Sequence, residues 1–487
     1  MKLADIWRAL VGDDPAPLGP LAEEAITTTV VDSRAAQPGS LFIALRGERT
    51  NGNLYVADAF TRGAVAAIVE ARATDLPGAW VQVGAGDLTR SGSPMRPFTF
   101  IVPDALVALQ HLAGYWRAQT ATVAVAITGS VGKTTTKEIV ANVLAQRYKT
   151  LWSEGNLNNE IGLPLTLLRL TPDHQRVVLE MGMYAPGEIT RLCELARPRI
   201  GVVTNVGPTH LERLGSIERI AQAKSELPQA LPPAEAGGVA ILNADDPRVL
   251  VMAGSTRARV FTYGLNPKAR LWADAIESQG LDGIRFRCHY NGEAFYVRLP
   301  MLGRHSVHTA LRGAAVGLAD GLSWTEILTG LQVLRGQLRL MVVTGLRDTT
   351  LIDDTYNASP DSMLAALNLL GEIANASHRA VAVLGDMYEL GSYEETGHRL
   401  VGGRAAQVVA KLIAVGPRAR WIADEALAEG MSTADIHPVE NNADAIAVLQ
   451  GLMRPGDVVL VKGSRAGGME SIVDALSRQK STDVEAK

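Results

Sequence analysis

Short apolar runs alternate with longer amphipathic stretches through the middle of the chain. The runs are rich in β-branched and small apolar side chains and span residues 121–127, 176–181, 199–204 and 238–242. Runs of this length are typical of buried strands, and the stretches between them have helical spacing, so the pattern predicts a parallel α/β sheet. The runs end in polar residues, namely Gly129 with Lys133, Glu180, Asn205 with His210, and Asn243 with Asp245. Because ligands of such sheets bind outside the carboxyl ends of the strands, we expect a site where these ends meet.

The segment before this sheet has a pattern of its own. Strands are predicted at residues 30–31, 41–45 and 64–69, and a short helix at 55–62. Residues 87–97 are polar and interrupted by Gly and Pro, which predicts a loop or linker. A helix capped by Asp104 then leads into the central sheet. We therefore expect a first α/β domain over residues 1–100.

Beyond the central strands, the spacing of apolar residues changes to alternation. Segments 284–290 and 294–299 alternate apolar and polar residues on either side of Asn291-Gly292. Asn-Gly between alternating segments is a hairpin signal. The pattern predicts a small antiparallel appendage on the central domain, which we place at residues 101–336.

A second parallel sheet is predicted in the last third of the chain. Strand candidates at 350–353, 381–384, 412–415 and 458–461 alternate with helices. Their ends also carry polar residues, namely Asp353-Asp354, Gly385-Asp386 and Lys462-Gly463-Ser464-Arg465. The pattern predicts a Rossmann-like domain over residues 337–487, and hence an α/β protein of three domains.

The most specific local pattern is T-G-S-V-G-K-T-T at residues 128–135, between the first central strand and a helix. In such a loop, main-chain N–H groups of the glycine turn and the helix N-terminus point at an anion. A lysine adds positive charge and a hydroxyl reaches Mg2+. The spacing is shorter than G-x-x-x-x-G-K-[ST], because Ile127 stands where the first glycine would be. With a strand before it and a helix after it, the loop predicts binding of a nucleoside triphosphate.

Composition and charge narrow the class of protein. A chain of 487 residues, 47% hydrophobic and 20% charged, is expected to be globular with more than one core. The net charge of −4 argues against nucleic-acid binding driven by phosphate neutralisation. Cys193 and Cys288 have neither metal nor disulfide-framework spacing, which is typical of a reducing compartment.

The apolar runs are also informative about location. None is long enough to span a bilayer, and Asp5 and Arg8 interrupt the N-terminus where a signal peptide would be apolar. We therefore expect a cytoplasmic protein without membrane insertion. A monomer is expected because no extended apolar stripe lies outside the inferred cores.

Together the motifs resemble the Mur ligase superfamily of ATP-dependent amide-forming enzymes, and within it the branch that joins D-alanyl-D-alanine to UDP-N-acetylmuramoyl-tripeptide. The resemblance runs from Asp32 to Glu470 and lies in motifs at residues 32–48, 128–135, 155–168, 180–189, 205–216, 242–247, 352–363, 384–391 and 461–465. It implies an N-terminal domain for the UDP substrate, a central phosphate-loop ATPase domain with its appendage, and a Rossmann-like C-terminal domain.

The resemblance also implies a mechanism that uses ATP and two Mg2+ ions. The γ-phosphoryl group passes to the tripeptide carboxylate, and the amine of D-Ala-D-Ala attacks the acyl phosphate, so charge placement dominates the barrier. Lys133 would hold the β- and γ-phosphates, and Thr134 would ligate the first Mg2+. Glu180 and His210 would ligate the second. Lys224 matches a lysine that the family carbamylates with CO2, which converts a cation into an acidic ligand beside the metals.

Further contacts follow from the same resemblance. The nucleotide loop comprises Gly129, Ser130, Val131, Gly132, Lys133, Thr134 and Thr135. Arg339 and Asp354 match ATP contacts from the C-terminal domain, so a closure step is expected to assemble the site. The implied substrate contacts are Ser33, Arg34, Gly47, Tyr356, Asn357, Lys462, Ser464 and Arg465.

Some positions depart from the family's pattern. The family usually has Gly-x-His-Asn with a further Asn three residues on, and this asparagine reads the adenine. Here the stretch is G-R-H-S-V-H-T at residues 303–309. Ser306 lacks the paired donor and acceptor of an amide. Weaker adenine selectivity or ATP affinity is expected, unless His305, His308 or main-chain groups substitute. Asn51-Gly52-Asn53 stands where Asp-Gly-His is common, which leaves the uridine contacts open.

Three alternatives remain to be weighed. The neighbouring ligase, which adds lysine or diaminopimelate, typically carries D-N-P-R and K-G-H-E, and neither is present. Folylpolyglutamate synthetase shares the phosphate loop but lacks the uridine-type domain suggested by residues 32–48. A non-catalytic nucleotide-binding protein would not be expected to keep Lys133, Thr134, Glu180, His210, Lys224 and Asp354 together.

Overall fold

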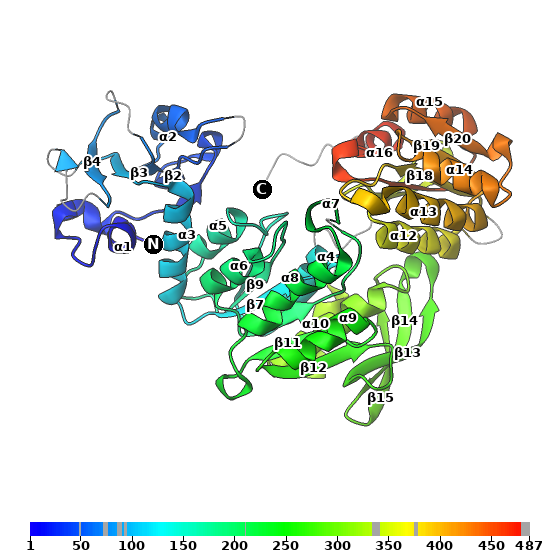
Figure 1. The fold of residues 1–487 in the computed structure, drawn as a ribbon, viewed down its shortest axis with the longest axis horizontal. Coiled ribbons are helices and arrows are strands. Elements are labelled where there is room, and N and C mark those ends of the chain that lie inside the picture. The colour runs from blue at the N-terminus through cyan, green and yellow to red at the C-terminus, as the bar shows by residue number, and fades with distance from the viewer. Residues whose placement is uncertain are drawn as a thin grey trace.

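The computed structural model describes residues 1–47, 50–71, 76–84, 90–91, 95–209, 211–333, 341–374 and 378–478. Three sheets with their helices follow one another along the chain (Figure 1). The α/β fold predicted from the sequence is confirmed. His210, Arg339 and the predicted boundary between residues 336 and 337 lie outside the described residues.

The N-terminal sheet has six strands in the order β1-β2-β3-β6-β4-β5. Their bounds are β1 Thr28–Val30, β2 Ser40–Ile43, β3 Ala66–Val69, β4 Ala79–Gln82, β5 Arg90–Ser91 and β6 Phe98–Ile101. Neighbours are parallel except β4 and β5. The predicted strands β1 to β3 and helix α2 (Val56–Thr61) are confirmed. The segment at residues 87–97, predicted as a loop or linker, instead contributes β5, which pairs with β4.

Helix α1 (Leu3–Leu10), which was not predicted, belongs to the core of this domain. Trp7 is 2% exposed and packs edge-on against Phe98 and Phe100 of β6, with ring centroids 6.3 and 6.5 Å apart. The N-terminal residues are therefore fixed to the sheet by aromatic packing.

The central sheet has nine strands in the order β15-β14-β13-β12-β11-β10-β7-β9-β8. Their bounds are β7 Val123–Thr128, β8 Thr150–Trp152, β9 Arg176–Glu180, β10 Ile200–Val203, β11 Val239–Asn243, β12 Arg259–Gly264, β13 Leu271–Ser278, β14 Ile284–Tyr290 and β15 Glu293–Leu299. Strands β7 to β13 pair in parallel. The four predicted strands are confirmed as β7, β9, β10 and β11, so the polar residues after them lie along one end of the sheet.

The predicted hairpin is formed by β14 and β15. Its turn residues Asn291 and Gly292 have φ of 51° and 84°, the two positive values that a type I′ turn requires. Because β14 pairs with β13, and β13 with β12, the antiparallel appendage continues the central sheet.

Helices cover both faces of the central sheet. Ala124 and Ala126 of β7 pack with α3 (Ala105–Ala118), α5 (Gly162–Leu168), α6 (Glu188–Ala196) and α8 (Ile217–Ala230). Val125 and Ile127 pack with α4 (Lys133–Leu144), α10 (Ser306–Ala319) and α11 (Trp324–Gln332). Burial on both faces explains why this strand is an unbroken apolar run. The short helices α7 (Leu211–Leu214) and α9 (Pro247–Leu250) follow β10 and β11.

The C-terminal sheet has the order β16-β17-β21-β18-β19-β20. Its strands are β16 Met341–Thr344, β17 Thr350–Asp354, β18 Ala380–Gly385, β19 Lys411–Val415, β20 Ile436–Val439 and β21 Val458–Lys462. The four predicted strands are confirmed as β17, β18, β19 and β21, whereas the edge strands β16 and β20 were missed. Helices α12 (Pro360–Ile373), α13 (Glu394–Val408) and α14 (Arg420–Ala428) cover one face, and α15 (Asn442–Leu452) and α16 (Glu470–Leu476) the other.

The C-terminal domain touches the central domain beside α7. A Cβ built on Gly391 would lie 2.9 Å from the Cα of Glu212. Figure 1 shows the N-terminal domain on the opposite side of the central domain, joined to it through α3. Within the described ranges, no helix is both long and apolar enough to cross a membrane.

Candidate active site

The phosphate loop joins β7 to α4. Gly129 has φ 147°, and a Cβ built on it would lie 1.8 Å from Oγ1 of Thr204, so only glycine fits. Gly132, the N-cap of α4, has φ 82°, a region that favours glycine. The first-turn N–H groups of α4 have no intrahelical partners and are available to an anion at the end of the sheet.

The loop is held in shape by the end of the neighbouring strand β10. The Asn205 side chain accepts a hydrogen bond from the Val131 N–H at 2.8 Å and donates to the Val131 carbonyl at 3.1 Å. The Thr204 hydroxyl donates to the same carbonyl at 2.7 Å. The Ser130 hydroxyl donates to the Gly207 carbonyl at 3.0 Å and accepts from the Gly207 N–H. The β10 end therefore works as a brace for the phosphate loop.

Three of the predicted catalytic and metal residues lie together beside this loop. The Lys133 ammonium donates to the main-chain carbonyls of Gly129 and Ser130, at 2.9 and 3.3 Å. The Thr134 hydroxyl donates to one carboxylate oxygen of Glu180 at 2.8 Å. The other oxygen accepts from the Asn158 amide at 2.8 Å, which fixes the carboxylate.

The chemistry of these donors fits magnesium. Mg2+ prefers oxygen ligands, and in nucleotide sites it uses few protein groups because phosphates and waters complete its shell. Thr134 and Glu180 supply a hydroxyl and a carboxylate within one hydrogen bond of each other. Among the residues that the structure describes, no group of three or more His, Cys, Asp or Glu side chains is arranged for a metal. These two donors lie beside the phosphate loop, where phosphate oxygens of a bound nucleotide could add further ligands.

Lys224 lies on α8 and is 2% exposed. Burial holds the pKa of its amine well below the ordinary lysine value, and the nearby charge of Lys133 lowers it further. Burial also lowers the pKa of Lys133, while the Glu180 charge acts in the opposite direction. Lys224 thus belongs to the same electrostatic cluster as the phosphate loop and favours its neutral form.

Residues of the C-terminal domain face this cluster. Burial raises the pKa of Tyr356, and the negative charge of Glu180 raises it further, so the phenol lies within range of that carboxylate. The Arg465 guanidinium is exposed and lies 5.5 Å from the centre of the Tyr356 ring. The structure thus places Tyr356 and Arg465 together on the side of the C-terminal domain that faces Glu180.

Other predicted residues of this domain form an ion pair and hydrogen bonds with residues of the same domain. The Lys462 ammonium is buried, pairs with Asp354 at 2.7 Å and donates to the Asn357 carbonyl at 2.9 Å. The Ser464 hydroxyl accepts from the Tyr388 N–H at 3.0 Å. In this structure Lys462 and Ser464 therefore hold the shape of loops that carry Asp354 and Arg465.

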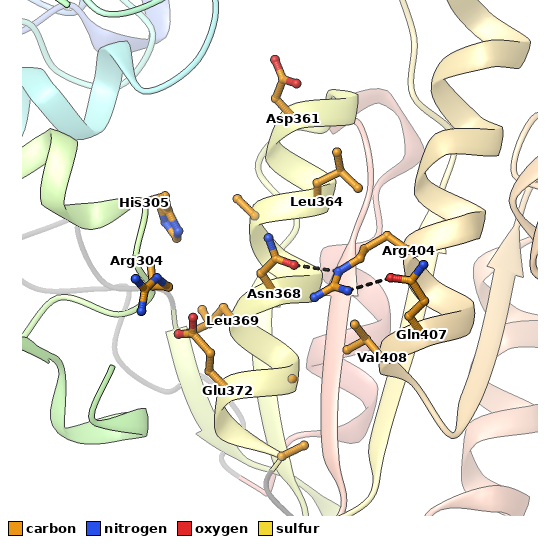
Figure 2. Close-up of a pocket in the computed structure, with 13 residues that line it drawn as sticks. Arg304, His305, Asp361, Leu364, Asn368, Leu369, Glu372, Arg404, Gln407 and Val408 are labelled. Atoms are coloured by element: carbon orange, nitrogen blue, oxygen red, sulfur yellow. Dashed lines mark hydrogen bonds between the residues drawn. The ribbon is translucent and has the colours of Figure 1, made fainter. Parts of the chain in front are cut away.

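A pocket of about 750 Å³ runs along α12 between the two domains (Figure 2). At one end is Asp361, whose carboxylate oxygen would lie 2.8 Å from a Cβ built on Gly207, next to the phosphate loop. Further along, Arg304 and His305 of the central domain face Glu372 of α12. One carboxylate oxygen of Glu372 is buried and has no hydrogen-bond partner in the described part of the chain.

Ser306 stands next to this pocket in the chain but is only 7% exposed. Its hydroxyl donates to the Leu302 carbonyl at 2.6 Å, within the first turn of α10. The hydroxyl that replaces the family's amide is thus engaged with the main chain.

The predicted residues of the N-terminal domain lie apart from this cluster. Hydrogen bonds from the Arg34 guanidinium and its main-chain N–H lower the pKa of Asp32 to about 2. Arg34 is exposed and Ser33 is 5% exposed. The exposed Gly47 donates its N–H to the Thr50 carbonyl at 2.9 Å. These residues belong to the N-terminal domain, which Figure 1 shows at the other end of the central domain from the C-terminal domain.

Family models match all three parts of the chain. They are described as Mur ligase family, catalytic domain (residues 25–85), Mur ligase middle domain (residues 127–317) and Mur ligase, glutamate ligase domain (residues 338–465). A protein of Mycobacterium bovis named UDP-N-acetylmuramoyl-tripeptide--D-alanyl-D-alanine ligase is 38% identical, over 96% of each chain. This chain belongs to the Mur ligase family.

Solved structures of Mur ligases agree in fold. A crystal structure of MurF from Acinetobacter baumannii is 31% identical and superimposes with a TM-score of 0.81 over 97% of each chain. MurF ligase from Thermotoga maritima, solved in complex with ADP, is 25% identical, with a TM-score of 0.77 over 92% of this chain and 97% of that one. The predicted three-domain Mur ligase architecture is confirmed.

The roles of several Mur ligase residues beside the site were not inferred from the sequence. Asn158 lies in the G-N-L-N-N motif, but no role was inferred for it, although its amide fixes Glu180. Thr204 and Asn205 precede and begin the N-V-G-P-T-H motif, and only their place beside the phosphate loop reveals them as its brace. For Thr204 and Asn205 the signal was a hydroxyl and an amide at a predicted strand end, whereas Asn158 carried no signal beyond its motif.

Proposed function

We propose that this Mur ligase joins D-alanyl-D-alanine to UDP-N-acetylmuramoyl-tripeptide with the hydrolysis of ATP. The observation that carries the proposal is similarity over 96% of the chain to a relative with that activity in its name. The Lys133–Thr134–Glu180 arrangement beside the phosphate loop supports it, because it provides charge and oxygen donors where a γ-phosphate would lie.

The reaction has two steps. A carboxylate oxygen of the tripeptide bonds to the γ-phosphorus as the bond to the β–γ bridging oxygen breaks, which gives an acyl phosphate and ADP. The amine of D-Ala-D-Ala then attacks the carbonyl carbon, loses a proton, and phosphate leaves. Residues 129–135 would cradle the phosphates. Lys133 would turn from the Gly129 and Ser130 carbonyls to the β- and γ-phosphates and stabilise the charge in transfer.

We assign the metal sites to the same cluster. Thr134 would hold one Mg2+, and Glu180, with His210 from outside the described residues, would hold a second. When bound, the ions neutralise phosphate charge and polarise the acceptor carboxylate. The hydrogen bond from Asn158 would keep the Glu180 carboxylate in its orientation for this role.

We further propose that Lys224 is carbamylated. Its buried, neutral-favouring amine can attack CO2, form an N–C bond and lose a proton to give a carbamate anion. The charge of Lys133, which opposes an ammonium at this place, would favour that anion. Labelled bicarbonate should give a carbamate NMR signal in the wild type, and the signal should be absent from Lys224→Ala.

The pocket along α12 is our proposed site for the nucleoside of ATP. Its Asp361 end adjoins the phosphate loop, and its other end offers Glu372 as an acceptor for an amino group such as that of adenine. Asp354, and Arg339 from outside the described residues, would contact ATP from the C-terminal domain. With Ser306 turned to Leu302, His305 is the better-placed group to contact the base.

We propose that the tripeptide and the dipeptide meet at Arg465 and Tyr356, with Asn357, Lys462 and Ser464 shaping the surrounding loops. Ser33, Arg34 and Gly47 would contact the UDP end, and Arg34 would then exchange Asp32 for phosphate. We also propose a cytoplasmic monomer with domains at 1–100, 101–336 and 337–487.

The decisive experiment measures phosphate release from MgATP with UDP-MurNAc-tripeptide, with and without D-Ala-D-Ala. Release that requires both substrates, with an amide product of matching mass, is expected, and Lys133→Ala should abolish it. Release with UDP-MurNAc-dipeptide and free lysine or diaminopimelate would instead assign the neighbouring step. Tight ATP binding without turnover on any pair would favour a non-catalytic role.

A further inference from the structure

Arg312 of α10 is a buried cation with an unsatisfied donor. The side chain is 5% exposed. Its Nε donates to the His308 carbonyl at 3.0 Å and its Nη2 to the Thr309 hydroxyl at 3.1 Å. Its Nη1 is buried and has no hydrogen-bond partner among the described residues. Burial lowers the pKa of the guanidinium, yet an arginine in a protein stays protonated, so a positive charge is enclosed here.

The unsatisfied end of Arg312 lies against the phosphate loop. A Cβ built on Gly132 would lie 3.0 Å from Nη1, so the guanidinium packs on the residue before Lys133. The side chain whose charge acts to raise the pKa of Arg312 is Tyr263, but burial raises the pKa of that phenol and keeps it neutral. A buried charge without a compensating anion destabilises a fold, so its presence calls for an anion that arrives from outside.

We propose that Arg312 is an electrostatic positioning residue for ATP, whose phosphates compensate its buried charge through the phosphate loop. The inference rests on the proposed function, in which residues 129–135 cradle those phosphates. Lys133 reaches the phosphates from the loop itself, whereas Arg312 acts from behind it. Because protein atoms rather than water separate the charges, their attraction is weakly screened by solvent and salt.

The same arrangement explains the altered loop at residues 303–309. The position three residues after Ser306, where the family has its further asparagine, is Thr309, and its hydroxyl holds the Arg312 guanidinium. Thr309 therefore holds the Arg312 guanidinium behind the phosphate loop, at the position where the family has an asparagine that contacts the adenine.

The test compares two variants by calorimetric MgATP titration and by thermal unfolding without nucleotide. Arg312→Met removes the charge and keeps the length of the side chain. We expect its MgATP Kd to rise about 10- to 100-fold, because a weakly screened attraction across the loop is lost. Its unfolding midpoint without nucleotide should stay unchanged or rise, because an unpaired buried charge is gone. Arg312→Lys keeps a charge and should bind MgATP more tightly than Arg312→Met.

Arg117 of α3 provides a matched control. It is 7% exposed, and its guanidinium donates to the carbonyls of Ala196 and Thr122 at 2.9 and 2.8 Å. Arg117→Met should therefore lower the unfolding midpoint and leave the MgATP Kd unchanged. A structural role for Arg312 would give this same result.

Two results would overturn the inference. One is an Arg312→Met protein that binds MgATP as the wild type does. The other is an equal loss of affinity in both Arg312 variants together with a lowered midpoint. If Arg312→Met does not fold, Arg312→Gln, which is also uncharged, takes its place. Failure of the wild type to bind MgATP would refute the proposed function instead, so the two failures are distinguishable.

Discussion

Asn205→Ala is expected to weaken MgATP binding by loosening the phosphate loop. The Asn205 amide makes two hydrogen bonds to Val131, one from its N–H and one to its carbonyl. Without them, the loop between Gly129 and Lys133 loses two of its hydrogen bonds to the end of β10. MgATP then has to order the loop as it binds, and the cost of ordering appears in the Kd.

The expected magnitude follows from the two bonds. A hydrogen bond contributes about 1 kcal/mol net to stability. An N–H that loses its only partner costs more free energy than a carbonyl that keeps a second partner. The Val131 carbonyl still accepts from the Thr204 hydroxyl, so the larger loss falls on the N–H. Val131 is half-buried, so water partly replaces the amide. We therefore expect a loss of about 1–2 kcal/mol, which is about a 5- to 30-fold rise in the MgATP Kd.

Asn53→Ala is the matched control for this measurement. The Asn53 amide also holds a loop, donating to the Asn51 side chain at 2.8 Å and accepting from the Glu70 N–H at 3.1 Å. It lies in the N-terminal domain, away from the phosphate loop. Both variants should lower the midpoint of thermal unfolding, but only Asn205→Ala should change the calorimetric Kd.

A second variant separates the brace from general destabilisation. Thr204→Val removes the other hydrogen bond to the Val131 carbonyl. Because both side chains act on one loop, the double variant should deviate from the sum of the two single effects. The reasoning is refuted if Asn205→Ala is destabilised as much as Asn53→Ala and yet keeps the wild-type Kd.

Three further predictions concern domain closure at Gly391, recognition of the nucleotide base by Glu372, and the two cysteine thiols. Gly391→Ala places a Cβ 2.9 Å from the Cα of Glu212, so kcat should fall about 3- to 10-fold with little change in the MgATP Kd. Gly280→Ala, at a similar φ of 60° but in open space, should leave kcat unchanged. Glu372→Ala should raise the KM for ATP by about tenfold and narrow the preference for ATP over GTP in steady-state assays, whereas unchanged selectivity would place the base elsewhere. Burial raises the pKa of Cys193 and Cys288 to about 12 from an ordinary 9.0, so their contribution to folding stability is complete below about pH 9 and is lost as the pH rises towards 12. The thermal midpoint of the Cys193→Ala/Cys288→Ala variant should therefore fall less steeply over this interval than that of the wild type, and parallel curves would contradict the assignment.

The central sheet was predictable because its strands are buried on both faces. Residues of β7, β9, β10 and β11 form unbroken apolar runs, and the polar residue that follows each run marks its end. The Asn291-Gly292 turn was equally clear, since few dipeptides accept two positive φ values. Edge strands gave no such signal. β20 is only partly buried and contains Pro438, so its sequence resembles a loop.

The ion pair between Lys462 and Asp354 shows a different limit of prediction from sequence. The sequence places a cation and an anion at two strand ends, and a substrate carboxylate is a reasonable partner for the cation. In the fold, β17 pairs with β21 in a register that sets Asp354 opposite Lys462, so the cation already has a partner. The register between two strands that are far apart in sequence therefore determines that Lys462 pairs with Asp354.

The phosphate loop extends this argument from single residues to the whole site. Its motif identifies the groups that meet the phosphates, but not what holds the loop or supplies charge behind it. The brace comes from Asn205, 74 residues further along, and the buried charge comes from Arg312 on α10. The sequence marks Asn205 only as a polar residue at a strand end, and its role follows from the pairing of β10 with β7. The role of Arg312 follows from the packing of α10 against α4. Arg312 is visible in the sequence, because it interrupts the run of small and apolar residues T-A-L-R-G-A-A-V-G at 309–317. A charged residue in such a run either destabilises the core or interacts with a partner that is not part of the chain. The position of Arg312 behind the phosphate loop favours a partner outside the chain.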